Sequence, residues 1–106
     1  MMAQAEKSVV LERLHASAQR ALRSQTPARL VAYSVDVDPA QPVLHLKAHF
    51  SSAPTEDEIE MLQGVETEIL ADFEDEFETQ TEVDVVPAHT TPGLLRGGVV
   101  FRRHRA

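Results

Sequence analysis

The sequence offers few side chains that could bind a metal ion or carry out catalysis. His45 and His49 lie four residues apart in an alternating segment, so they would share one face of a strand. At the usual rise of about 3.3 Å per residue they are about 13 Å apart, too far for both to bind one metal ion. Cysteine is absent, which excludes thiol nucleophiles, disulfides and zinc sites with Cys ligands. We therefore interpret both histidines as exposed strand residues and expect no metal and no cofactor.

No sequence motif typical of an enzyme occurs elsewhere. The chain has no His-Glu-x-x-His pair, no glycine-rich phosphate loop and no Gly-x-Ser-x-Gly turn. Thr90, Thr91 and the serines have no identifiable base beside them in the sequence, and His15, His89 and His104 are scattered. The residue pattern therefore predicts a protein that is not an enzyme.

Charge is distributed unevenly along the chain. The protein has 17 acidic residues against 10 Lys and Arg, a net charge of -7. Residues 48–95 hold thirteen of those acids and no Lys or Arg, whereas the segments before and after them carry +2 and +4. Such a balance excludes the broad basic surface that binds nucleic acid.

Many of these acids fall on the outer face of a helix expected over residues 55–73 and on the segment after it. A solvated helix face is often acidic for solubility alone. Repulsion among so many carboxylates nevertheless destabilises the fold unless a basic partner neutralises them, and Met61 adds a soft apolar contact. The predicted partner-binding residues are Asp57, Glu60, Met61, Glu68, Asp72, Glu74, Asp75 and Glu76.

Glu66 differs from the other acids of this helix. At 100° per residue it falls near Phe73, inside the apolar stripe, so we expect it to be at least partly buried. A buried carboxylate needs a donor such as Tyr33 or an Arg, or its pKa rises. Two interpretations stay open: a structural buried acid that fixes how the helix packs on the sheet, and a functional carboxylate in a cleft.

Two amphipathic helices are expected. Residues 3–23 are rich in helix-forming residues whose apolar members recur at spacings of three and four, and Pro27 ends this pattern. Thr55 and Glu58 have the spacing of a capping box at the start of the second helix. Its apolar stripe comprises Ile59, Leu62, Val65, Ile69, Leu70 and Phe73.

The remaining segments indicate four strands. Residues 30–38 and 43–50 alternate in polarity on either side of a Pro-rich turn, which favours an antiparallel hairpin with one wet face. Residues 79–86 and 98–103 are two further strands, separated by Pro87, Pro92 and Gly93. The order α-β-β-α-β-β predicts the α+β class, with one four-stranded antiparallel sheet packed against two helices.

Length and hydropathy indicate a single domain over residues 1–106, with residues 1–7 and 104–106 expected to fray. The longest apolar run near the start is Val9 to Leu11, too short for an export signal, and no segment is long enough to span a bilayer. These features predict a cytoplasmic protein without a membrane partner.

A short basic tail ends the chain at Arg102, Arg103, His104 and Arg105. On an acidic domain without an aromatic platform, we expect this tail to pair with the chain's own acids or to stay solvated, and not to bind nucleic acid. Pairing with the acidic helix of another copy is the alternative, and it would produce a homodimer.

Four segments carry a family resemblance: residues 45–50 (HLKAHF), 54–59 (PTEDEI), 65–73 (VETEILADF) and 99–102 (VVFR). Together they resemble small bacterial immunity proteins of contact-dependent growth inhibition and other polymorphic toxin systems. Residues 66–73 are the most specific part of this resemblance, and the flanking strands are generic.

The resemblance implies a cytoplasmic, non-enzymatic protein that binds and neutralises a cognate bacterial toxin domain. The acidic helix agrees in sign with a basic nuclease toxin, whose cleft binds phosphates. Two alternatives remain: a small non-catalytic interaction or homodimeric assembly domain of unrelated role, and a small enzyme that uses Glu66 with a histidine across a cleft.

Overall fold

The computed structural model describes residues 4–38, 40–73, 77–87 and 90–103. Its elements follow the predicted order of helices and strands. They are α1 (Gln4–Ser24), β1 (Leu30–Asp38), β2 (Val43–Phe50), α2 (Glu56–Asp72), β3 (Glu78–Val85) and β4 (Val99–Arg102). The local patterns therefore located each element to within one or two residues of its ends.

The four strands form one mixed sheet in the order β3-β2-β1-β4. β1 is antiparallel to both β2 and β4, as predicted, but β3 runs parallel to β2. The expectation of a wholly antiparallel sheet was wrong because α2 carries the chain back along the sheet between β2 and β3. A helical crossover of this kind places two strands side by side in the same direction.

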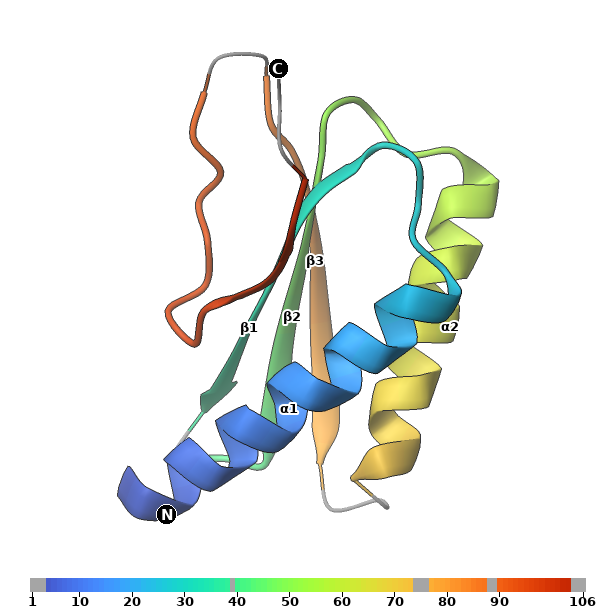
Figure 1. Ribbon diagram of the computed structural model, residues 1–106. Helices are drawn as coiled ribbons and strands as arrows, with labels where there is room; N and C mark the ends of the chain where they lie inside the picture. The colour runs from blue at the N-terminus through green and yellow to red at the C-terminus, as the bar shows by residue number, and fades with distance from the viewer. Residues whose placement is uncertain (1–3, 39, 74–76, 88–89, 104–106) are drawn as a thin grey trace.

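Both helices pack on the same face of the sheet (Figure 1). The register places Tyr33 beside Ala48 and Val35 beside Leu46, and all four belong to the core under the helices. A register shift between Leu30 and Ala32 puts Leu30, and not Val31, into this core at the start of β1. The helices contribute the rest of this core. Its helical members that are fully buried or nearly so are Leu14, Ala18, Ala21, Leu22, Leu62, Val65 and Ile69.

The segment that joins β3 to β4 runs from one edge of the sheet to the other on the side opposite the helices (Figure 1). Its Leu95 N–H donates to the Ser34 hydroxyl over 3.0 Å, and the Gly93 carbonyl accepts from Lys47 over 2.8 Å. Ser34 and His49 are fully buried on this face. The predicted exposure of His49 was therefore wrong, because this connection covers it. The predicted wet face is covered only in part, since Asp36, His45 and Lys47 on the same face stay partly exposed.

The connection returns to the sheet through two glycines. A Cβ on Gly97 would lie 2.3 Å from the Val35 carbonyl oxygen, and Gly98 has a φ of 111°. Any side chain at Gly97 would collide with the backbone of β1, and left-handed geometry at Gly98 favours glycine. The His15 side chain of α1 is hydrogen-bonded through Nε2 to the Gly97 carbonyl over 2.8 Å. This bond holds the two glycines between α1 and β1.

Candidate partner-binding surface

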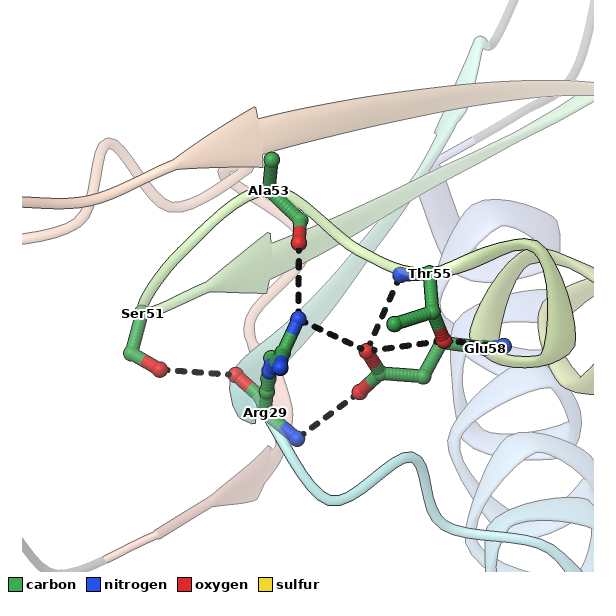
Figure 2. Close-up of polar contacts among 5 residues, drawn as sticks. All are labelled: Arg29, Ser51, Ala53, Thr55 and Glu58. Carbon is green, nitrogen blue, oxygen red and sulfur yellow. Dashed lines mark hydrogen bonds and ion pairs between the residues drawn. The ribbon is translucent and has the colours of Figure 1, made fainter.

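The acidic first turn of α2 begins with a capping box, as predicted (Figure 2). The Thr55 hydroxyl accepts the Glu58 N–H over 3.2 Å, and the Glu58 carboxylate accepts the Thr55 N–H over 3.1 Å. These bonds satisfy two of the backbone groups that a helix start leaves without a partner.

Glu58 is also bound to the start of β1 (Figure 2). Its carboxylate accepts the Arg29 N–H over 2.9 Å and lies 3.8 Å from the Arg29 guanidinium, which donates to the Ala53 carbonyl over 3.2 Å. Burial by itself would raise the pKa of Glu58, but these hydrogen bonds outweigh it and hold that pKa below its ordinary value. Glu58 therefore fixes the helix start against the sheet.

The exposed acids at this fixed helix start are Glu56, Asp57 and Glu60, which we call the α2 acidic surface. Asp57 and Glu60 belong to the predicted set, whereas Glu56 was not included in it. No salt bridge found in the described part of the chain involves any of these three carboxylates. The predicted contact residue Met61 is half-buried.

Asp72 was predicted to be a free outer acid, but α1 binds it. Its carboxylate forms an ion pair with Arg20 and accepts the Ser17 hydroxyl over 2.5 Å. Arg13 donates to the Asp72 carbonyl over 3.2 Å and lies 4.6 Å above the Phe73 ring. The last turn of α2 has no basic residue of its own, so these arginines supply the positive charge that a helix C-terminus favours.

Glu68 is exposed but lies in the groove between the two helices. The groove is lined by Ser17, Arg20, Ala21, Ser24, Glu68, Ala71 and Asp72. Because Arg20 lines the same groove, the charge there is mixed. Glu74, Asp75 and Glu76 lie outside the described residues, so the structure brings together only part of the predicted acidic set.

Glu66 is half-buried over β3, where it accepts a hydrogen bond from the Thr81 hydroxyl. The predicted donors were Tyr33 or an Arg, but neither Tyr33 nor any described Arg donates to it. Glu66 does affect Tyr33: burial first, and the Glu66 charge second, raise the pKa of the Tyr33 hydroxyl. Glu66 lines neither of the two described grooves beside α1.

A polar cluster that the sequence patterns did not indicate links three strands below the connection. His49 Nε2 lies 3.0 Å from the Ser34 hydroxyl, and its Nδ1 lies 3.6 Å from an Asp84 carboxylate oxygen. These are the residue types of a catalytic triad, but the Ser34 hydroxyl is fully buried and accepts the Leu95 N–H. A substrate carbonyl could not reach it, so we assign this cluster to holding the connection in place.

In the described part of the basic tail, backbone oxygens bind Arg103, and no acid forms a salt bridge with Arg102 or Arg103. Arg103 donates to the carbonyls of Leu30 over 3.0 Å and Pro27 over 3.4 Å, and it lies 5.7 Å from the Phe101 ring centre. Arg102 is exposed, and His104 and Arg105 fall outside the described residues.

Among the described residues, no cluster of three or more His, Cys, Asp or Glu is arranged to hold a metal ion. No helix in the same ranges is long and apolar enough to cross a membrane.

Comparison with known proteins connects this fold to a family. No curated protein matches the chain significantly. The family model described as MafI2 immunity protein matches residues 11–105, which include all four strands, α2 and most of α1. This match confirms the resemblance to bacterial immunity proteins. The chain belongs to the MafI2 immunity protein family.

Proposed function

We propose that this protein acts in the cytoplasm, where it binds a cognate bacterial toxin domain and neutralises it, with the α2 acidic surface in the interface. Membership of an immunity protein family supports the binding of a toxin. The observation that carries the choice of surface is the set of exposed carboxylates at Glu56, Asp57 and Glu60, which have no salt-bridge partner in the described chain. Their charge is available to a basic partner.

The position of these carboxylates favours binding. The capping box and Arg29 hold the first turn of α2 against the sheet, so little conformational freedom would be lost when a partner binds there. A nuclease that binds phosphates has a basic cleft, and an array of carboxylates can occupy or cover such a cleft. We therefore propose a basic nuclease as the toxin, with association accelerated by charge at low ionic strength.

The test requires a cognate toxin domain, which we expect in the product of the gene directly upstream, in a catalytically inactive form. The double variant Asp57→Lys with Glu60→Lys should reduce its association rate about tenfold or more at low salt, and the difference should shrink at high salt. The matched control is Glu6→Lys with Glu12→Lys, which makes the same charge change on exposed residues of α1 and should have a much smaller effect.

Two outcomes separate the parts of this proposal. Equal association rates for the two double variants would show that the α2 acidic surface is not in the interface. The active toxin domain should degrade DNA or RNA, and an equimolar amount of this protein should stop that reaction and rescue cells that express the toxin. Failure of the wild-type protein to bind or rescue would refute neutralisation of this toxin.

A further inference from the structure

β3 lies at the edge of the sheet, and one side of its backbone faces no described strand. Glu78 donates its N–H to the Pro42 carbonyl, and Val86 donates to the Phe50 carbonyl, so the even-numbered residues bond β2. In a parallel pair, alternate residues direct their N–H and C=O groups to opposite sides of the strand. The backbone groups of Thr79, Thr81, Val83 and Val85 therefore point away from the sheet.

The side chains of β3 give this edge two different faces. On the helix side, Val83 and Val85 remain 45% and 46% exposed, among the most exposed large apolar side chains of the described protein. On the opposite side lie Glu78, Glu82 and Asp84, which the register places beside Val43, Lys47 and His49 of β2. One edge therefore carries apolar side chains on one face and carboxylates on the other.

An exposed edge strand is a template for a further strand, and its side chains determine which strand fits. Antiparallel pairing with β3 of a second copy would put acidic strands side by side, which is unfavourable. A strand with basic side chains on one face and apolar side chains on the other would instead place its cations beside Glu78, whose charge no described salt bridge uses. They would also lie beside Glu82 and Asp84, whose side chains stay 67% and 42% exposed although they lie 4.0 Å from Lys47 and 3.6 Å from His49. The apolar residues of such a strand would then cover Val83 and Val85.

We infer that β3 is a docking edge to which a toxin strand of alternating basic and apolar residues adds as a fifth strand. This inference rests on the proposed function and identifies a second part of the same interface. α2 lies next to β3 (Figure 1), and Thr81 of β3 bonds Glu66 of α2. One basic domain can therefore contact this edge and the α2 acidic surface together.

The first test compares two valine substitutions on exposed sites. Val83→Lys puts a cation on the docking edge and removes an apolar contact, so it should weaken binding of the inactive toxin domain about tenfold or more. The matched control Val9→Lys changes a valine that is 56% exposed on α1 and should alter the affinity less than twofold. Urea unfolding of both variants verifies that each remains folded. Equal affinities for the two folded variants would overturn the inference.

The second test measures amide hydrogen exchange by NMR in the free and bound protein. Addition of a strand should slow exchange at Thr79, Thr81, Val83 and Val85, because their N–H groups gain acceptors. The amides of Gln80, Glu82 and Asp84 already face β2 and should change less. A complex that forms without slower exchange at the first four amides would overturn the docking edge and leave the proposed function standing.

The remaining outcomes separate this inference from its premise. Absence of any complex with wild-type protein would refute the proposed function, and the toxin-docking inference with it. Slower exchange on β3 in the protein alone, increasing with concentration and accompanied by a dimer in sedimentation, would show that the edge pairs with a second copy. That result would also overturn the inference.

Discussion

Replacement of Glu58 by Gln should destabilise the protein more than replacement of any exposed acid of α2. The carboxylate accepts N–H groups from both Thr55 and Arg29, and hydrogen bonds to a charged group are worth about 1.5–3 kcal/mol each. A glutamine retains one acceptor oxygen, so one of these two N–H groups would lose its partner. The ion pair with the half-exposed Arg29 guanidinium adds less than about 1 kcal/mol. We expect a total loss of about 2–3 kcal/mol.

The effect should depend on pH in a defined direction. Hydrogen bonding holds the pKa of folded Glu58 below its ordinary value of 4.5, so the unfolded chain binds this proton more tightly than the folded protein. The stabilisation is therefore complete above pH 4.5 and is lost as the pH falls through the lower folded pKa. The free energies of unfolding of wild type and Glu58→Gln should differ most near neutral pH and become similar in acid.

Urea unfolding at pH 7 and pH 3 measures both effects, and Glu60→Gln provides the control on the same helix because Glu60 is exposed. A loss of about 2–3 kcal/mol is a large share of the total stability of about 5–15 kcal/mol typical of a small domain. It corresponds to a decrease in Tm of about 10 °C or more. If the free energies of unfolding of Glu58→Gln and Glu60→Gln differ by less than about 0.5 kcal/mol at pH 7, Glu58 does not have this structural role.

Two further predictions concern the connection that covers the sheet. Gly97→Ala should cost about 2 kcal/mol or more in urea unfolding because its Cβ would meet the Val35 carbonyl. Gly93→Ala should stay within about 0.5 kcal/mol of wild type, because its Cβ would meet only the Lys47 Nζ at an ordinary contact distance of 3.6 Å. Burial first, and Lys47 second, lower the pKa of His49 below its ordinary 6.5, although the Asp84 carboxylate opposes this shift. The unfolded chain then binds the His49 proton more tightly, so stability should fall as the pH drops below 6.5. His49→Gln should flatten this slope between pH 7.5 and pH 5.5, and an unchanged slope would contradict it.

The elements of the fold could be predicted because their signals are local. Thr55 and Glu58 are three residues apart, so the capping box is visible in the sequence and is present in the structure. The alternation over residues 32–38 and 43–50 likewise separates the residues that face the helices from those that do not, and only the register shift between Leu30 and Ala32 interrupts it. These patterns depend on neighbours along the chain, and they fixed the hairpin and both helices.

The pairing of strands and the covering of the sheet depend on distant contacts. Arg29 and Glu58 are 29 residues apart, and Ser34 and Leu95 are 61 apart, with no spacing that links them. Alternation showed that Ser34 and His49 share the face away from the helices, but it could not show that the connection between β3 and β4 crosses that face. The direction of β3 was missed for a related reason, because periodicity carries no information about a strand's direction.

Contacts between residues distant in the sequence also decide which acids of residues 48–95 are suitable for testing partner binding. Net charge counts every carboxylate of residues 48–95 equally. Glu58, however, is hydrogen-bonded at the helix start, and Asp72 forms an ion pair with Arg20 of α1. Charge reversal at Asp72 would place a cation beside Arg13 and Arg20, so weaker binding could result from loss of helix packing. The acids on which binding can be tested cleanly are those whose charge the fold does not use, which are the α2 acidic surface and the exposed Glu78 of β3.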